Sequence, residues 1–439
     1  MENSRRRKRS DGAVRGIAVN PRSMGRKRKS KVEGWKTLLL VSVLLVLVGA
    51  LCWVFLVQKP FSASSSDEAA QDYWGLAELS VHERGLVVRN VDWDSIVNEH
   101  GRPWKDSGHR HFLNSVLVYV TPWNSLGYDM AKKFRAKFTH VSPVWYQLQR
   151  GKDRLELLGR HDVDKQWIDA VRQDGSPMIV PRVVLEGSPL HMLVDPAERK
   201  QAIDLIVNEC KYMEYDGVVL EAWTAWAVYN ILENPNLRHK ALEFVLALGE
   251  TLHSMKASKS GSEKRNMQLH FVIPPPSDYK KDPRVFTRAD MTMLGNSIDG
   301  LSVMTYDFSG PNHPGPNAPA PWIDSTLASL RRMSEDSDAA PEVLLGLNFY
   351  GNDYTLPQGG GAIVGHQCVA LLEKYKPSIT WDKKSEEHYF MYDGEDAKHV
   401  VFYPTLASVS ARLNTANKVG SGISIWEIGQ GLEYFFDLL

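Results

Sequence analysis

Five short segments place aromatic residues, and in three of them carboxylates as well, at the ends of apolar runs. Each run is expected to be a strand that carries these groups at its carboxyl end. Aromatic rings stack on the C–H faces of sugars, and a few polar groups then fix the orientation of the ligand. The segments are SVLVYVTPW (115–123), KFTHVSPVW (137–145), YDGVVLEAW (215–223), MTYDFSG (304–310) and SGISIWEIG (421–429). The candidate ligand contacts are Trp426, Tyr306, Asp307, Trp223, Trp145 and Tyr119.

Two glutamates are candidates for proton transfer. Val219, Glu221 and Trp223 alternate along one expected strand, so all three should point into the same interior. Glu221 lies roughly 6–7 Å deeper than Trp223, whereas a proton donor must come within about 3 Å of the oxygen that it protonates. Glu221 is therefore a poorly placed catalytic candidate, and its alternative role is a buried carboxylate satisfied by neighbouring groups. Glu186 follows the run PRVVL, but nothing in the sequence places it against a bond to be broken.

The sequence gives little support for a metal site. His109 and His111 are close enough in sequence to form a ligand pair, but no Cys, His or Asp partners recur at a ligand spacing. A solvated pair explains them. We expect neither a metal ion nor a cofactor.

Eight apolar, β-rich runs position the candidate residues. Patterns typical of helices alternate with them, such as ERKQAIDLIVNECKYME and LEFVLALGETLHSMKAS. This alternation predicts a parallel sheet, and eight units over about 310 residues predict closure into a (β/α)8 TIM barrel. An open doubly wound sheet is the alternative, but the segment after the first run, VTPWNSLGYD, lacks a Gly-rich phosphate loop. The eight runs are 115–123, 137–145, 177–185, 215–223, 267–275, 299–308, 342–351 and 421–429.

The gap between the seventh and eighth runs is too long for one helix. It contains SITWD, HYFMYD and KHVVFYP, which predict a small antiparallel insert near the barrel mouth. The helix that carries Cys368 is expected to belong to this insert.

Several motifs resemble family 18 of the glycoside hydrolases, the chitinases. YDGVVLEAW, MTYDFSG, LLGLNFYG (344–351) and SGISIWEIG occur in the order seen in that family. The likeness covers roughly residues 76–439, and the ending SIWEIGQGLEYFFDLL is most similar to the chitinase-domain-containing branch, which includes a stabilin-interacting chitinase-like protein. The resemblance implies a TIM barrel that binds N-acetylated glycans, in which Tyr306 and Asp307 hydrogen-bond the sugar and Trp426 forms the floor of the central subsite.

The chain departs from the family at the catalytic motif D-G-x-D-x-D-x-E. Asp216 and Gly217 match its opening, but Val219 and Glu221 stand at the second and third aspartate positions. Trp223 stands at the position of the glutamate that protonates the glycosidic oxygen. An indole cannot supply general acid catalysis, which typically contributes about 10²–10⁴-fold. The resemblance therefore implies that hydrolysis is impaired.

The N-terminal residues have a different composition. Residues 1–36 carry 13 Lys/Arg and 3 Asp/Glu, and residues 37–57 form an uncharged apolar run long enough to cross a bilayer. We expect a basic cytosolic tail (1–36), a transmembrane signal-anchor (37–57), a polar stalk (58–75) and a barrel domain (76–439). The positive charges before the span predict a cytosolic N-terminus and a barrel in the lumen of the endomembrane system or outside the cell. A cleaved signal peptide is the alternative.

Three functions are consistent with these features. The first is a lectin-type protein that binds chito-oligosaccharide or a related glycan without cleaving it. The second is an active glycoside hydrolase that uses Glu221 or Glu186 as its acid. The third is an endomembrane scaffold or trafficking protein with a protein partner. Nucleic acid is not an expected partner, because the basic block at residues 5–9 is better explained as an anionic-lipid contact or an arginine-type sorting signal.

Overall fold

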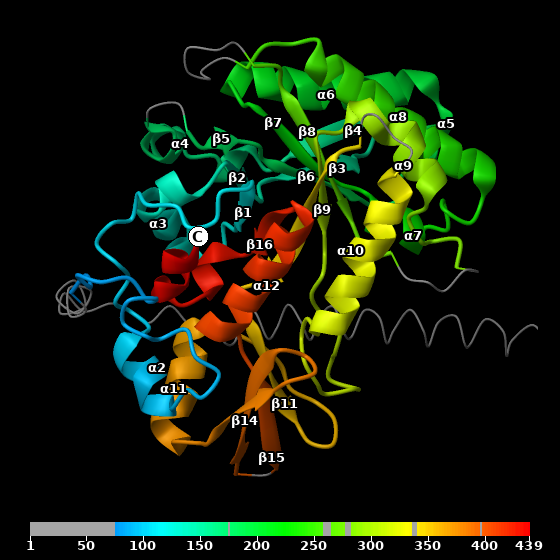
Figure 1. Cartoon of the computed structure of the whole chain (residues 1–439). Coiled ribbons are helices and arrows are strands. Elements are labelled where there is room, and N and C mark those ends of the chain that lie inside the picture. The colour runs from blue at the N-terminus through cyan, green and yellow to red at the C-terminus, as the bar shows by residue number, and fades with distance from the viewer. Residues whose placement is uncertain (1–74, 174–175, 258–264, 277–281, 336–339, 396) are drawn as a thin grey trace, which may run out of the picture. The chain divides into compact units, whose positions relative to one another are not determined.

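Within the residues that the structure describes, eight parallel strands pair side by side around a closed circuit (Figure 1). The computed structural model describes residues 75–439 apart from 174–175, 258–264, 277–281, 336–339 and 396. Ile423 pairs with Leu345 on one side and with Val116 on the other, which joins the last strand to the first. The strands are β1 (Val116–Val120), β2 (His140–Pro143) continuing as β3 (Tyr146–Arg150), β5 (Met178–Ile179) continuing as β6 (Arg182–Glu186), β7 (Gly217–Glu221), β8 (Gln268–Ile273), β9 (Gly300–Val303), β10 (Glu342–Asn348) and β16 (Gly422–Trp426).

This arrangement confirms the predicted TIM-barrel-like α/β fold. Six of the eight apolar runs contain their whole strand, whereas the second and third strands continue, as β3 and β6, past the ends of their runs. The interior of the barrel is apolar in its middle layer and polar at one end. The apolar members are Leu117, Tyr119, Val144, Val180, Val219, Val272 and Leu344, with Met304 and Trp426 packed against them.

At the polar end, the imidazoles of His140 and His270 both approach the Gln268 side-chain oxygen, at 2.8 and 3.3 Å. Burial lowers the pKa of His140 to about 4 and the pKa of His270 well below its usual value. Both rings are therefore neutral at physiological pH, and the barrel holds no unpaired charge at this point.

Helices surround the strands (Figure 1). Their starts follow local sequence signals: Asp195 caps α6 by accepting the Ala197 N–H at 2.9 Å, and Asn234 caps α8 in the same way. In both helices a proline occupies the first turn, where its missing N–H has no intrahelical partner to lose. The helices are α2 (Trp93–Glu99), α3 (Ser125–Lys133), α4 (Lys165–Val171), α5 (Leu190–Val194), α6 (Pro196–Met213), α7 (Trp223–Val228), α8 (Pro235–His253), α9 (Arg288–Leu294), α10 (Ala320–Ser334), α11 (Gly365–Tyr375) and α12 (Leu406–Val419).

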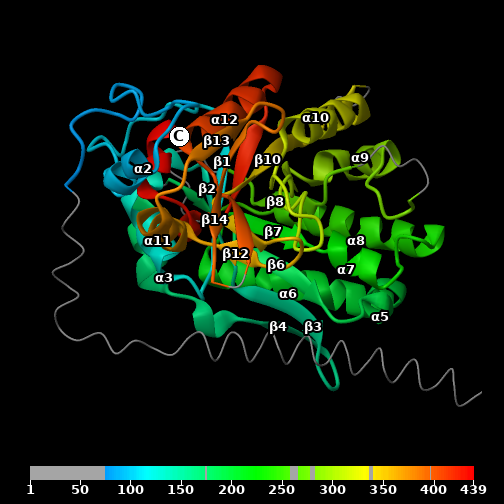
Figure 2. The ribbon, with the colours of Figure 1, turned by 90° about the horizontal axis from the view of Figure 1, so that it is seen from below.

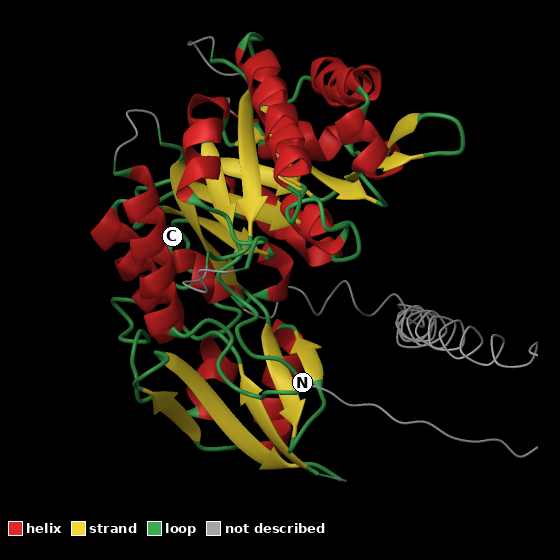
Figure 3. Ribbon diagram, turned by 90° about the vertical axis from the view of Figure 1, so that its right-hand side faces the viewer, coloured by secondary structure: helices red, strands yellow, loops and turns green. Residues whose placement is uncertain are grey.

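An antiparallel sheet interrupts the barrel between β10 and β16. Its strand order is β12-β11-β15-β14-β13, and Figure 3 shows it as a layer apart from the barrel strands. This sheet and α11, which carries Cys368, form the predicted insert. The strands are β11 (Gly351–Thr355), β12 (Gly361–Ile363), β13 (Ile379–Asp382), β14 (Glu387–Asp393) and β15 (Lys398–Phe402). A second addition is β4 (Leu155–Leu158), which forms a hairpin with β3 that extends beyond the barrel (Figure 2).

The membrane prediction requires correction. The expected tail and membrane span, and nearly all of the expected stalk, fall in residues 1–74, outside the described part of the chain. Among the described residues, no helix combines the length and apolar character needed to cross a bilayer. The longest, α8, has 19 residues but contains Arg238, His239 and Lys240 in its first turns. We therefore withdraw the predicted single-pass topology with its cytosolic N-terminus and its luminal or extracellular barrel.

The two cysteines in the described part of the chain are free and buried. Cys210 lies on α6 and Cys368 on α11. Burial raises the pKa of both thiols well above the usual range, so both are protonated at neutral pH.

Candidate functional site

Trp426 lies at the carboxyl end of β16, where active sites of TIM barrels are built. Its indole is half-buried, with the ring of Tyr119 beneath it at a centroid distance of 5.2 Å. The Tyr119 hydroxyl is 2.9 Å from the Ser302 hydroxyl, and burial raises the pKa of Tyr119. Tyr119 is thus a neutral, fixed support, and Trp426 can offer an aromatic face.

Glu221 and Arg182 form an ion pair beside Trp426. The Arg182 Nε donates to the Glu221 carboxylate at 2.6 Å, and the two side chains are only 13% and 20% exposed. The same guanidinium lies 5.6 Å from the centre of the Trp426 ring, within the range of a cation–π contact. A guanidinium can only donate hydrogen bonds, so Glu221 is the acceptor of this pair.

Asp307 is presented just beyond β9 in an unusual backbone conformation. Its φ of 61° lies in the left-handed region, which few residues other than glycine adopt. The Asp307 N–H donates to the side-chain oxygen of Asn317 at 2.7 Å, and the Tyr350 hydroxyl donates to the Asp307 carboxylate. The neighbouring Tyr306 ring lies 6.3 Å from that of Tyr350, and burial raises the pKa of Tyr306 well above its usual value.

These groups form one constellation, which we call the barrel-mouth cluster. Trp426 contacts Tyr119 and Arg182, and Arg182 binds Glu221. Tyr350 contacts both Tyr306 and Asp307. After the larger effect of burial, the charges of Glu221 and Asp307 raise the pKa of Tyr306 and the charge of Arg182 lowers it, which is consistent with one group. Four predicted ligand contacts and the predicted acid candidate are therefore brought together. The members of the cluster are Tyr119, Arg182, Glu221, Tyr306, Asp307, Tyr350 and Trp426.

Two other predicted ligand contacts lie elsewhere. Trp223 is 1% exposed, packs against Trp226 and Phe286, and donates its indole N–H to the Arg284 carbonyl. It begins helix α7 two residues after the last residue of β7, so the alternation that would have aimed it into the barrel stops before it.

Trp145 is fully buried between the barrel and the helices that flank it. Its indole N–H donates to the Tyr128 hydroxyl at 2.8 Å, and its ring contacts Trp167. The second strand does not end at Trp145, as predicted, but continues as β3 to Arg150. Neither Trp145 nor Trp223 presents a free face for a sugar in this conformation.

Two other carboxylates singled out in the sequence, Glu186 and Asp216, lie outside the barrel-mouth cluster. Glu186 is exposed at the end of β6. Asp216, the first residue of the catalytic motif, is 2% exposed and accepts from Arg172 and from the Ile179 N–H, both at 2.7 Å. Asp216 therefore ties β7 to β5 at the end of the barrel opposite the cluster.

Sequence reasoning missed Arg182 and Tyr350, and it did not select Trp123 or Phe308, which are 61% and 54% exposed at the ends of β1 and β9. Arg182 could have been found from the sequence. It lies on the opposite face of the strand from the apolar residues Val183 and Leu185, which pack against the helices, so it faces the interior of the barrel. A buried arginine requires a charged partner, and Glu221 was available.

One group in the described residues has the composition of a metal site. Ligand atoms of His191, Asp195 and Glu198 lie within 4.8 Å of one another. However, Arg150 already binds both oxygens of Glu198, and Asp195 caps helix α6. These contacts account for the group without an ion.

Comparison with known proteins agrees with the fold and identifies the family. The family described as "Glycosyl hydrolases family 18" matches residues 189–431, more than half of the chain. The "Cortical fragment-lytic enzyme" of Bacillus subtilis (strain 168) is 24% identical over 176 residues, which cover 38% of this chain and 39% of that protein. The chain thus matches about two-fifths of the length of that relative.

Solved structures resemble most of the chain. A chitinase from Chromobacterium violaceum ATCC 12472 superposes with a TM-score of 0.60 at 20% identity, covering 74% of this chain and 98% of that one. The spore cortex-lytic enzyme SleL of Bacillus cereus gives a TM-score of 0.58 at 17% identity, covering 83% of this chain and 85% of that one. A family 18 chitinase from Cycas revoluta in complex with allosamidin gives 0.58 at 16% identity, covering 74% and 97%. At such identities the structures support the fold, and the sequence match to the family extends over most of the barrel. The chain therefore belongs to family 18 of the glycosyl hydrolases.

Proposed function

We propose that this protein binds chito-oligosaccharide or a related N-acetylated glycan at the barrel mouth and does not cleave it. We also propose that residues 76–439 form the glycan-binding domain and that the chain belongs to the chitinase-domain-containing branch. The observation that carries the proposal is that strand β7 presents no free carboxylate at the position of the family's proton donor. Its one carboxylate that faces the barrel mouth, Glu221, is bound to Arg182, and Trp223 stands where the family motif has its proton donor.

The geometry of Trp426 supports binding. A half-buried indole fixed over Tyr119 offers a flat apolar face of the kind that packs on a pyranose ring. Arg182 approaches the same indole, and its hydrogen bond to Glu221 fixes its position. Family membership supports the class of ligand, because a mutant of the Cycas revoluta chitinase has been crystallised with (GlcNAc)4.

Asp307 supplies a polar contact beside this platform. Its carboxylate is exposed on one side and held by the Tyr350 hydroxyl on the other. A carboxylate held in place accepts hydrogen bonds from sugar hydroxyl or acetamido N–H groups. Tyr306, adjacent in sequence and protonated at all physiological pH values, can donate its own O–H.

Cleavage would need a proton at the glycosidic oxygen. Glu221, the last residue of β7, accepts from the Arg182 guanidinium, so one of its carboxylate oxygens already has a protein partner. The indole of Trp223 is buried and donates to a backbone carbonyl. Loss of general acid catalysis alone slows such a reaction by about 10²–10⁴-fold.

Calorimetry on the full-length chain tests the proposal. Chitohexaose should give saturable heat that returns to baseline after each injection, with no slow heat over hours. Trp426→Ala should weaken binding about tenfold or more, because an aromatic platform is lost at a cost of about 1.4 kcal/mol. The matched control is Trp381→Ala, which removes a partly buried indole from strand β13 of the insert and should leave the affinity unchanged. Equal affinities of wild type and Trp426→Ala would contradict this site.

The alternative is a hydrolase with a different acid, favoured by family membership itself. It predicts continuous heat proportional to protein concentration and accumulation of shorter oligosaccharides. Glu221→Gln or Glu186→Gln should then abolish turnover, and the variant that does so identifies the acid. Absence of both binding and turnover across a panel of N-acetylated glycans would exclude both functions.

A further inference from the structure

We propose that Glu387, in the insert, is a positioning residue for the barrel-mouth cluster and acts through Asn317 on Asp307. The inference rests on the proposed glycan-binding function and names a feature that controls it. The path starts on strand β14 of the insert, crosses to the segment before helix α10, and ends at the residue that contacts the glycan.

Asn317 holds the backbone of the site. Its side-chain oxygen accepts the Asp307 N–H at 2.7 Å, and its main-chain oxygen accepts the Phe308 N–H at 2.8 Å. Asn317 is only 1% exposed, so water does not compete for these bonds. Asp307 has a left-handed φ, a conformation that residues other than glycine keep only where the surroundings impose it. The two bonds from Asn317 are part of that constraint.

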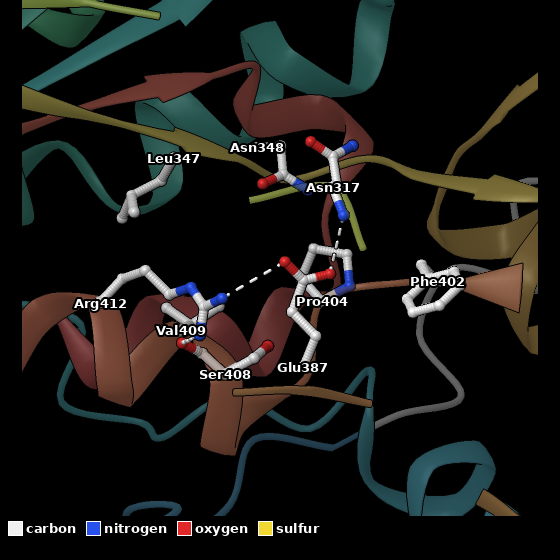
Figure 4. A pocket seen from close by; sticks show the side chains of 9 residues that line it. All are labelled: Asn317, Leu347, Asn348, Glu387, Phe402, Pro404, Ser408, Val409 and Arg412. Carbon is white, nitrogen blue, oxygen red and sulfur yellow. Dashed lines mark hydrogen bonds and ion pairs between the residues drawn. The ribbon is translucent and has the colours of Figure 1, made fainter. Parts of the chain in front are cut away.

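Glu387 in turn holds Asn317. One oxygen of its buried carboxylate accepts the Asn317 N–H at 2.9 Å, and the other accepts the Ala318 N–H at 2.7 Å. Figure 4 shows the carboxylate pointing at this backbone from one side and facing Arg412 on the other. Two charge-assisted bonds to consecutive N–H groups fix both the position and the direction of the segment.

Arg412 completes the arrangement from helix α12. Its Nη2 lies 3.3 Å from the Glu387 carboxylate and donates to the main-chain oxygens of Ala318 at 2.6 Å and Ser385 at 2.8 Å. The guanidinium is 6% exposed. Arg412 therefore contacts the barrel segment and the insert at once, and the charge of Glu387 is needed to balance it.

This path differs from nonpolar packing because it consists of hydrogen bonds, which fix the orientation of the groups that they join. The Glu387 carboxylate binds the backbone N–H of Asn317, and the Asn317 side chain in turn binds the backbone N–H of Asp307. A change at Glu387 should therefore alter the site and not only the stability of the insert. Glu386, the preceding residue, has its carboxylate 3.7 Å from exposed Arg89 and provides a matched control.

The test measures chitohexaose affinity in full-length variants by calorimetry. Asn317→Ala and Glu387→Gln should each weaken binding about tenfold, whereas Glu386→Gln should not change it. In an Asp307→Ala background, Asn317→Ala should have no further effect, because both changes then act on the same contact. Additive losses in the double variant would show that Asn317 acts elsewhere and would overturn the proposal.

A second readout does not depend on any glycan. Amide hydrogen exchange of the segment 304–310 should become faster in Asn317→Ala and in Glu387→Gln but not in Glu386→Gln. Unchanged exchange in both variants would overturn the positioning role. If exchange responds as expected while wild type binds no glycan, the proposed function fails and the positioning path stands. If Glu387→Gln does not fold, Glu387→Asp takes its place: the shorter side chain cannot hold both N–H groups, so the same faster exchange is expected, and unchanged exchange would overturn the positioning role.

Discussion

Glu427 lies one residue beyond Trp426 and is completely buried. Its carboxyl accepts from the Asn124 side chain and from the Gly429 N–H at 3.1 Å, yet burial raises its pKa to about 7 from an ordinary value of 4.5. The folded protein therefore keeps a proton on this group over a pH range in which the unfolded chain has lost it. The free energy of unfolding should fall as pH rises from about 4.5 to 7, by about 3 kcal/mol in total from this group.

Glu427→Gln should remove that pH dependence, because an amide does not titrate. We expect the difference in unfolding free energy between pH 5 and pH 8, measured by urea denaturation, to be smaller in the variant than in wild type. Glu186→Gln serves as the control, since Glu186 is exposed and should leave the difference as it is. An identical difference in Glu427→Gln and wild type would show that Glu427 is ionised throughout.

At the same scale, alternation along strands predicted which residues face the barrel only where strands stay regular. It works for Tyr119 and Trp426, which lie within β1 and at the end of β16. It fails for Trp145, because strand two is interrupted between β2 and β3 and the direction of the side chains shifts there. Trp223 lies past the end of its strand. Sequence periodicity does not reveal such breaks, since they depend on contacts with distant segments.

Strand β7 depends on a glycine at its first residue. Gly217 has a φ of 152°, and a Cβ there would lie 2.0 Å from the Gln268 main-chain oxygen on β8. Gly217→Ala must therefore push the two strands apart at the point where their pairing begins. We expect it to lower the free energy of unfolding by about 3 kcal/mol, as overpacked interior substitutions do, measured as a shift of the urea midpoint.

The matched control for this element is Gly420→Ala. Gly420 ends helix α12 with a φ of 69°, but no atom lies within 4 Å of the position that a Cβ would take. Only the backbone strain of a left-handed alanine remains, at about 1 kcal/mol. If both variants lose the same stability, the close approach of β7 and β8 is not the reason for the glycine.

The strands of the barrel were easier to predict from the sequence than the strands of the insert. Parallel strands are buried on both faces, so they appear as continuous apolar runs, and all eight could be located. In the insert, β13, β14 and β15 carry aromatic and β-branched residues that mark them as strands. β11 and β12 read GNDYT and GAI, with no such pattern, and they form strands because β15 supplies a partner to β11 and β11 supplies one to β12.

For the molecule as a whole, the insert and the barrel should unfold together. Phe390, Val401 and Tyr403 of the insert region belong to the same apolar core as the barrel strands, and the Arg412–Glu387 pair joins the two. Exchange of deuterium at segments 387–393 and 344–348 should therefore show the same urea midpoint. Opening of the insert at lower urea concentration would show that it is a separate unit.

The order of strands and helices along the chain predicted the barrel. It did not predict the barrel-mouth cluster, because that cluster also depends on contacts made by irregular segments. Tyr350 reaches Asp307, and Asn317 reaches it from another segment, through turns that no periodic pattern describes. The family motif indicated Asp307, Tyr306 and Trp426 by position. It could not indicate the groups that hold Asp307, because Tyr350 lies in the turn between β10 and β11 and Asn317 in the irregular segment before α10.

The protected state of Cys210 and Cys368 has a practical consequence for labelling. Neither buried thiol of the described part should react with a maleimide while the protein is folded, since only the accessible thiolate is a good nucleophile. A cysteine introduced in place of the exposed Trp123, at the end of β1, would be the preferred attachment point for a fluorescent dye. Arrival of a glycan at the rim could then be followed by emission intensity in a Cys52→Ser background, with Cys210 and Cys368 left in place.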